Sequence, residues 1–200
     1  MTHRSRLSAF ACFMLLPVVA RAQSGPDDPA CQPPQPARTA VLTNRVRIAS
    51  TGEPGERMRI VLRFADERGA PHAGMMVYAY HTNAQGHYPV GAGAVGCYRW
   101  HGALHAFAQT GRDGRVIFET IRPGPYPGRT DPQHVHVVVQ FPKVRGFYLN
   151  ALVFSDDPRV TPAYRASERD AGSTGISTAQ RDSAGTWQVN HTIRFSRPSR

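Results

Sequence analysis

Short runs in which apolar and polar residues alternate are the feature that most limits the fold of this chain. From Arg57 to Phe64, apolar side chains occupy every second position, and three of the intervening positions are arginine. Neighbouring side chains of a β-strand point to opposite faces, so this run has one face for a core and one wetter face. The pattern predicts a half-buried strand.

Six runs, some alternating and some continuously apolar, are predicted to be strands: Arg57–Phe64, Met75–Tyr80, Val116–Ile121, His134–Phe141, Leu149–Phe154 and Trp187–Phe195. Eighteen glycines and 17 prolines among 200 residues imply many turns and exclude long helices. We therefore predict an all-β fold, a β-sandwich of short, mainly antiparallel strands with long loops. Residues 156–184 are polar and lack alternation, so we expect a long surface loop there, with room for one helical turn.

The first 22 residues have the three parts of a secretory signal peptide. A leader with Arg4 and Arg6 precedes an apolar stretch from Leu7 to Ala20, and a small-residue cleavage site ends at Ala22. The apolar stretch is too short for a permanent transmembrane helix, although a hydrophobic first helix is the alternative interpretation. We expect an exported protein, periplasmic or secreted, with no membrane attachment after cleavage.

Two further segments follow the signal peptide. Residues 23–45 are rich in proline and are expected to form an extended arm, and residues 46–200 the β-sandwich domain. Cleavage would leave two cysteines, Cys31 and Cys97. An oxidising compartment would permit a disulfide between them, but two free thiols are also compatible with the sequence.

The positive charge of the chain is dispersed. The formal net charge is +10, and it is +7 without the leader, which holds three arginines and no acid. Lys143 is the one lysine, and the arginines lie singly between apolar residues. Without a basic run we predict no nucleic-acid partner. The excess of arginine would suit an anionic ligand.

The segment from His134 to Phe141 is the most informative for chemistry. On a strand, His134 and His136 share one face, whereas Val135, Val137 and Val139 face the other way, toward a core. Two imidazoles on one face can form a two-point metal clamp. A wet sheet face that happens to carry histidines is the alternative.

Two tyrosines in turns could complete a ligand set. Tyr126 lies between two prolines, which restrict its backbone, and Tyr88 follows a glycine turn at the end of a predicted strand. Phenolate oxygen favours trivalent iron, and a bound cation lowers the pKa of a phenol. For each tyrosine alone, packing on a sheet edge is the alternative interpretation.

These pieces, in this order, resemble the intradiol ring-cleavage dioxygenases, which include the catechol and protocatechuate dioxygenases. The matching segments are Gly86-His87-Tyr88, Asp113-Gly114, the run from Phe118 to Pro127, and His134-Val135-His136. The resemblance extends from about Met58 to Phe154, and it implies a β-sandwich fold. It is closest to the compact, exported members, because the helical dimerisation region of catechol dioxygenases is missing. It leaves open whether the protein forms oligomers.

The resemblance implies that Tyr88, Tyr126, His134 and His136 hold a non-haem Fe(III). A catecholate would displace Tyr126, which would take a substrate proton as it leaves. The ring would then react with O2 and open between its two hydroxyl-bearing carbons, giving a muconate-type dicarboxylate. The expected partners are thus a small catechol-like aromatic and O2.

Three positions depart from the family pattern. Asp131 stands where the family has an arginine, and Arg129 is the candidate for that cation, displaced by a two-residue insertion. The Thr-Asp of the family reads Thr110-Gly111. The glutamine of the strand after the histidines is absent, with Asn150 or Ala151 in its region. These departures keep a non-catalytic periplasmic aromatic- or metal-binding β-sandwich protein as the alternative function, and a metal-free structural module as another.

Some other residues need an interpretation. Residues 91–96 match a dinucleotide-binding glycine pattern without the strand and helix that such a site needs, so a loop at the pocket rim is expected. Arg99, Trp100, His101 and His105 could line that rim or pack in ordinary loops. His81 and His87 are expected to be hydrogen-bonded loop residues.

Overall fold

A computed structural model gives the fold, and it describes residues 35–37, 39–90, 101–170 and 175–196. In chain order the elements are β1 (Arg45–Arg47), β2 (Arg57–Ala65), β3 (Met76–Tyr80), β4 (His105–Gln109), β5 (Arg115–Ile121), β6 (His134–Gln140), β7 (Phe147–Tyr148), β8 (Leu152–Phe154), α1 (Pro162–Asp170), β9 (Ile176–Ser177), β10 (Ala179–Arg181) and β11 (Trp187–Arg194). Within the described part of the chain, no helix has both the length and the apolarity needed to cross a bilayer.

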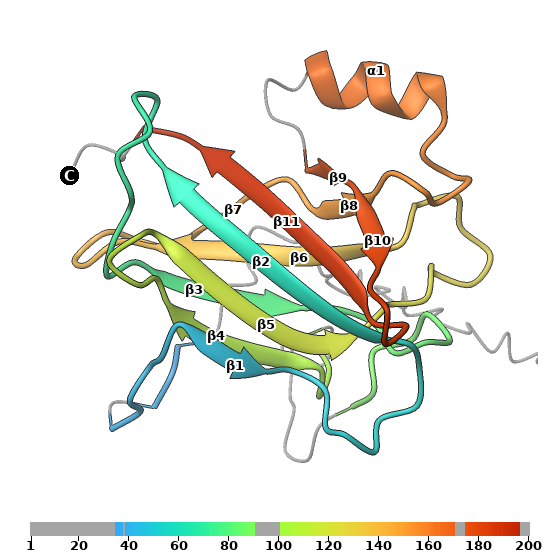
Figure 1. Ribbon diagram of the computed structural model, residues 1–200, viewed down its shortest axis with the longest axis horizontal. Helices are drawn as coiled ribbons and strands as arrows, with labels where there is room; N and C mark the ends of the chain where they lie inside the picture. Colours follow the sequence, from blue (N-terminus) through green and yellow to red (C-terminus); the bar gives the residue numbers. More distant parts are fainter. Residues whose placement is uncertain (1–34, 38, 91–100, 171–174, 197–200) are drawn as a thin grey trace, which may run out of the picture.

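The strands form two sheets that face each other (Figure 1). One sheet has five strands in the order β1-β5-β2-β11-β10, and the other runs β4-β3-β6-β8-β9, with β7 also paired to β6. Antiparallel pairs dominate, while β1–β5, β2–β11 and β8–β9 are parallel. The prediction of an all-β sandwich with mainly antiparallel strands is confirmed.

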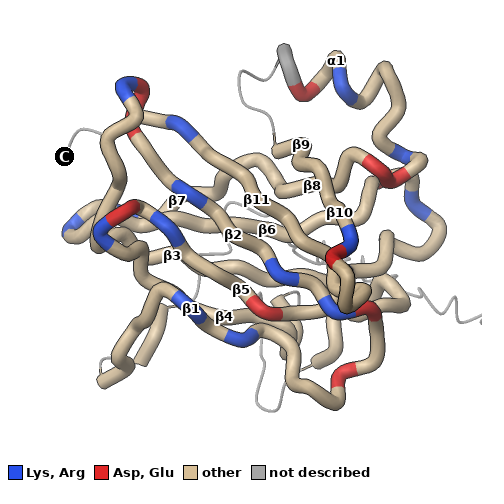
Figure 2. The backbone as a smooth tube through the Cα atoms, viewed as in Figure 1, with Lys and Arg blue, Asp and Glu red and all other residues tan. Residues whose placement is uncertain are grey.

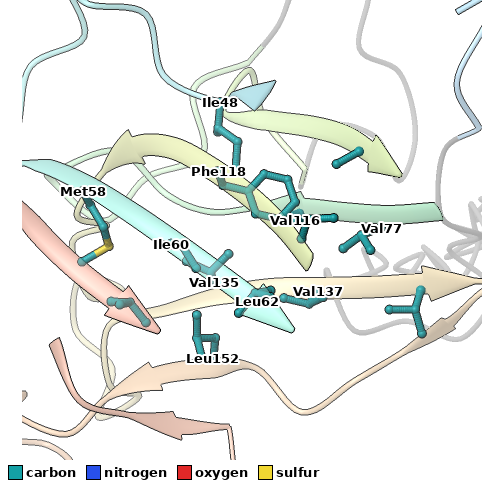
Figure 3. Close-up of a cluster of buried hydrophobic side chains, with 14 of the residues drawn as sticks. Ile48, Met58, Ile60, Leu62, Val77, Val116, Phe118, Val135, Val137 and Leu152 are labelled. Carbon is teal, nitrogen blue, oxygen red and sulfur yellow. The ribbon is translucent and has the colours of Figure 1, made fainter. Parts of the chain in front are cut away.

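The core fills the space between the sheets (Figure 3). Met58, Ile60 and Leu62 of β2 are at most 2% exposed and face Val135 and Val137 of β6, which are 1% exposed. The alternation in β2 therefore buries one face as predicted. Its other face is the outside of the five-stranded sheet, where arginines recur along β1, β2, β5 and β11 (Figure 2).

The expectation of a loop over residues 156–184 is wrong. The nine-residue helix α1 lies there, followed by β9 and β10. Thr161 begins the helix, because its hydroxyl accepts a hydrogen bond from the Tyr164 N–H and the next residue is Pro162, whose missing N–H costs nothing at this position. Strands β9 and β10, of two and three residues, are too short to show a period.

Other strands also differ from the sequence prediction. β1 begins at Arg45, in the segment expected to be an arm, and it pairs in parallel with β5. β4 was not predicted, because His105–Gln109 shows no clean alternation of apolar and polar residues; its place is fixed by pairing with β3. The strand expected over Leu149–Phe154 is confined to β8, Leu152–Phe154.

Candidate metal centre

β6 places the two histidines as the sequence predicts. His134 and His136 project from the outer face of the six-stranded sheet, and Val135, Val137 and Val139 belong to the core on the other side. His136 is 8% exposed, so its ring is enclosed by protein while its backbone stays in the sheet. The alternation along one strand thus accounts for both imidazoles on one face.

The Tyr88 loop, which follows β3, is shaped by Asn83. The Asn83 side-chain oxygen accepts hydrogen bonds from the backbone N–H groups of Gln85 and His87, at 3.1 and 3.0 Å. The Gly86 N–H in turn donates to the Asn83 carbonyl, and Gly86 has φ of +81°, a value that side chains disfavour. This tight turn directs the chain so that Tyr88 faces the histidines.

The Tyr126 loop, which follows β5, fits against the Tyr88 loop backbone to backbone. The Gly124 N–H donates to the Asn83 carbonyl at 2.8 Å, and the Thr82 hydroxyl donates to the Gly124 carbonyl at 2.7 Å. A Cβ on Gly124 would overlap the carbonyl oxygen of Ala84, and one on Gly86 would overlap that of Pro125. Two glycines at this contact therefore bring the two tyrosine-bearing loops together.

Four side-chain donor atoms converge as a result. The Tyr126 hydroxyl lies 2.6 Å from the Tyr88 hydroxyl, 3.1 Å from Nε2 of His134 and 3.2 Å from Nε2 of His136. The two Nε2 atoms are 3.2 Å apart. All four residues expected to bind a metal are thus within one cluster, with Tyr126 at its centre.

The two imidazoles present nitrogen lone pairs to this cluster. Nδ1 of His134 lies 2.7 Å from the carbonyl oxygen of Pro132 and donates to it, which leaves Nε2 as the acceptor atom facing the tyrosines. Burial lowers the pKa of His136 well below its usual value, and the nearby His134 acts in the same direction. His136 is therefore neutral at neutral pH, as a metal ligand must be.

The chemistry of the donor set fits a ferric ion. The described residues hold no group of three or more histidine, cysteine, aspartate or glutamate side chains that could bind a metal, so a metal here would need the tyrosines. Two phenol oxygens with two imidazole nitrogens supply hard oxygen and borderline nitrogen ligands. Loss of both phenol protons would add two negative charges and favour the trivalent state.

Aromatic rings behind His136 were missed by the sequence reasoning. Tyr80 of β3 is the direct cross-strand neighbour of His136, and its ring stacks on the imidazole with centroids 4.5 Å apart and planes 14° apart. His101 stacks on Tyr80 at 4.2 Å, and the Tyr78 hydroxyl hydrogen-bonds Nδ1 of His101 at 2.9 Å. The alternation of Tyr78 and Tyr80 was the available signal. His101, 2% exposed, belongs to this stack.

Arg129 lies beside the cluster, but its guanidinium is paired with the carboxylate of Asp131. Its guanidinium carbon is 5.4 Å from the centroid of the Tyr126 ring, and its Nε donates to Asp131 at 2.7 Å. The hydrogen bond from Arg129 holds the pKa of Asp131 below its usual value. The two residues that depart from the family pattern thus form an ion pair beside Tyr126.

A second arginine supports the segment that leads into β6. Arg122 is 9% exposed and donates to the Gln133 side chain and to Asp156, each at 2.8 Å. Its guanidinium carbon lies 5.1 Å from the centroid of the Phe154 ring and 4.3 Å from that of the Trp187 ring. The Gln133 N–H also donates to Asp157 at 2.6 Å. These contacts fix the backbone just before His134.

The remaining sequence expectations have different outcomes. His81 is a buried hydrogen-bonded residue, as expected, and His87 is exposed, with its backbone bonded to Asn83. His105 is exposed and its Nδ1 lies 2.8 Å from the Gly102 carbonyl oxygen. Asn150 is directed at Glu168 of α1. The signal peptide, Cys31, Cys97, residues 91–96, Arg99 and Trp100 lie outside the described residues.

Comparisons with known proteins agree on one family. A family model described as a dioxygenase, covering the C-terminal domain of intradiol enzymes, matches residues 32–178, more than half of the chain. No curated protein sequence matches the chain. Among solved structures, the dioxygenase domain of a dioxygenase carbohydrate-binding protein fusion from Streptomyces sp. SirexAA-E is similar with a TM-score of 0.58 and 19% identity, over 82% of this chain and 96% of that one.

Two other structures are similar at the same level. An intradiol ring-cleavage dioxygenase from Tetranychus urticae has a TM-score of 0.55 and 17% identity, over 77% of this chain and 87% of that one. Catechol 1,2-dioxygenase from Acinetobacter sp. ADP1, inhibited by bound mercury, has a TM-score of 0.59 and 16% identity; 78% of this chain covers 58% of that enzyme. At these identities the likeness concerns the fold.

Proposed function

Because this chain belongs to the intradiol ring-cleavage dioxygenase family, we propose that it is a non-haem Fe(III)-dependent enzyme that opens a catechol-type ring with O2. In this reaction the bond between the two hydroxyl-bearing carbons breaks and both oxygen atoms of O2 enter a muconate-type dicarboxylate. No external electron donor is needed. The observation that carries the proposal is the convergence of Tyr88, Tyr126, His134 and His136.

We assign these four residues as the iron ligands. Bound iron(III) would serve as Lewis acid and template for the catecholate and O2. Contacts within the protein position the ligands: the interlocked loops fix the tyrosines, Pro132 fixes the His134 ring and Tyr80 stacks on the His136 ring. Such preorganisation reduces the ordering that metal binding requires.

Tyr126 is the residue we assign to proton transfer. Its hydroxyl is the one that contacts all three other donor atoms, and the next two residues, Pro127 and Gly128, lie at the surface. When Tyr126 gives up its place to substrate, its oxygen accepts a proton from a catechol hydroxyl. Arg129, above the ring of Tyr126, is positioned to stabilise negative charge there once it turns from Asp131.

The visible spectrum of the purified protein, with an iron assay, tests the ligand set. We expect a tyrosinate-to-iron charge-transfer band and about one iron per chain. Tyr126→Phe should weaken or shift the band. Tyr164→Phe is the matched control, since Tyr164 is also a partly buried phenol but lies on α1, and it should leave the band unchanged. A colourless protein that stays colourless after ferric loading would contradict the proposal.

Oxygen uptake with catechols tests turnover separately. We expect uptake of one O2 per ring opened and a product with the ultraviolet absorption of a conjugated dicarboxylate. Bound iron whose band shifts with catechol, but without oxygen uptake, would favour the non-catalytic binding protein instead. The Arg129–Asp131 ion pair is the observation behind that second candidate, because the acid holds the guanidinium that lies over the Tyr126 ring.

Export is a separate proposal that rests on the first 22 residues of the sequence. Mass spectrometry of the protein recovered from cells checks it. A mature N-terminus at Gln23 in the extracytoplasmic fraction is the expected result, and an intact leader on protein retained inside the cell would refute it.

A further inference from the structure

A pocket of about 220 Å³ lies on the outer face of the five-stranded sheet. One cross-strand row forms its floor: Arg47 of β1, Glu119 of β5, Arg59 of β2 and Gln188 of β11 are register neighbours. The candidate metal centre belongs to the outer face of the other sheet, so the core separates the two sites. Nothing in the proposed dioxygenase reaction uses this pocket.

The carboxylates that line the pocket already have partners. Glu119 accepts a hydrogen bond from Nε of Arg45 at 3.0 Å through one oxygen and lies 3.5 Å from Arg47 through the other. Asp182 accepts the N–H groups of Ala184 and Thr186 with one oxygen and the Gln188 amide with the other. Neither acid therefore compensates the remaining cation.

Arg57 also lines the pocket, but its guanidinium donates to the backbone carbonyl oxygens of residues 50, 53 and 55. The remaining cation is Arg59. Its side chain makes no hydrogen bond and no ion pair with any described residue, although its Nε is buried. A buried donor without an acceptor is rare in folded proteins and calls for a ligand, an ion or an ordered water. Because no partner fixes the guanidinium, it can turn toward a group that enters the pocket.

We propose that this pocket binds an oxyanion, a carboxylate or a phosphate group, with Arg59 as its principal anchor. A guanidinium offers a planar fork of N–H donors that matches two oxygens of such a group. Thr51 and Thr186 also line the pocket and supply hydroxyl groups. The proposal is independent of the dioxygenase function, because it needs neither iron nor the tyrosines.

Titration of the purified protein with sodium phosphate and, separately, with sodium succinate tests the site. Chloride is exchanged for each anion at constant ionic strength, and two-dimensional NMR follows the arginine Nε–H signals. We expect the signal assigned to Arg59 to shift and to saturate as the anion concentration rises. The unfolding midpoint should rise over the same range of anion concentration. Saturation by phosphate alone, by succinate alone or by both identifies the accepted class of oxyanion.

Two variants separate a site from general charge screening. Arg59→Gln should weaken binding by at least about tenfold. Arg63→Gln is the matched control, because Arg63 lies on the same strand and the same face, bonds to the Gly69 carbonyl and does not line the pocket. It should bind like the parent protein. If Arg59→Gln fails to fold, Arg59→Lys keeps the charge but not the fork and is expected to bind weakly. Equal, unsaturated shifts in all proteins would overturn the proposal.

Discussion

His81 should make the stability of this protein fall as the solution becomes acidic. The residue follows β3 directly, is 0% exposed, and has both ring nitrogens engaged, Nδ1 with the Thr82 carbonyl at 2.7 Å and Nε2 with the Thr120 hydroxyl at 2.6 Å. Burial lowers its pKa from 6.5 to about 4, and the Thr82 carbonyl offsets only part of this effect. The neutral imidazole is thus the form that the fold requires.

The size of the effect follows from the pKa difference. Between the unfolded pKa of 6.5 and the folded pKa of about 4, the unfolded chain binds a proton that the folded protein does not, so the free energy of unfolding rises with pH. This stability is complete above pH 6.5 and is lost as the pH falls toward 4. At about 1.4 kcal/mol per pKa unit, the loss is about 3 kcal/mol.

Chemical unfolding of the metal-free protein at a series of pH values between 7.5 and 4 measures this loss. The matched variant is His81→Gln, whose amide can still bond Thr120 but does not titrate. At pH 7.5 it should cost about 1 kcal/mol for the lost bond to the Thr82 carbonyl. As the pH falls, the free energy of unfolding of the variant should decrease less steeply than that of the parent protein. The two slopes should differ by about 1.4 kcal/mol per pH unit. His101 and His136 titrate in both proteins, so they cancel in the difference.

Parallel curves for the two proteins across this range would refute the reasoning. They would mean that the imidazole titrates alike in the folded and unfolded chains, and hence that His81 is not enclosed in the way the structure shows. A steeper curve for the variant would contradict the sign of the pKa shift.

Three further changes have defined outcomes. Gly124→Ala should destabilise the fold by about 3 kcal/mol and abolish iron binding, because its Cβ would overlap a backbone oxygen of the Tyr88 loop; Gly52→Ala, with open space around it, should do neither, as thermal unfolding and an iron assay would record. Tyr80→Leu should lower iron affinity by about tenfold or more in competition with a chelator, by freeing the His136 ring, whereas Tyr80→Phe should retain it. Arg122→Gln should lower the free energy of unfolding by about 2 kcal/mol, because it leaves buried partners without their donor.

The sequence could predict the candidate centre only where the direction of a ligand's side chain is set by its own segment of the chain. Period two on β6 is a property of seven consecutive residues, so it revealed that His134 and His136 share a face. The Tyr80–His136 stack depends instead on which strand lies beside β6 and in which register. No local pattern contains that information, and the same holds for the row in which Arg59 lies.

The strands of the fold also differ in whether a local sequence pattern could predict them. β2 and β11 alternate clearly and were predicted close to their true bounds, whereas β9 and β10 have too few residues to carry a period and exist because longer neighbours pair with them. Helix α1 was missed because its composition is polar, with mostly exposed residues, although the Thr161-Pro162 pair is an ordinary helix start.

The contact between Gly86 and Gly124 also limits how such a centre can be re-engineered. The backbones of the Tyr88 loop and the Tyr126 loop are in direct contact, so the shape of each loop depends on the other. Grafting the Tyr88 loop alone from a relative, to change the substrate, would place a foreign backbone against the native Tyr126 loop. Transplants should therefore succeed only when both loops move together, as one exchangeable unit some forty residues apart in sequence but joined in space.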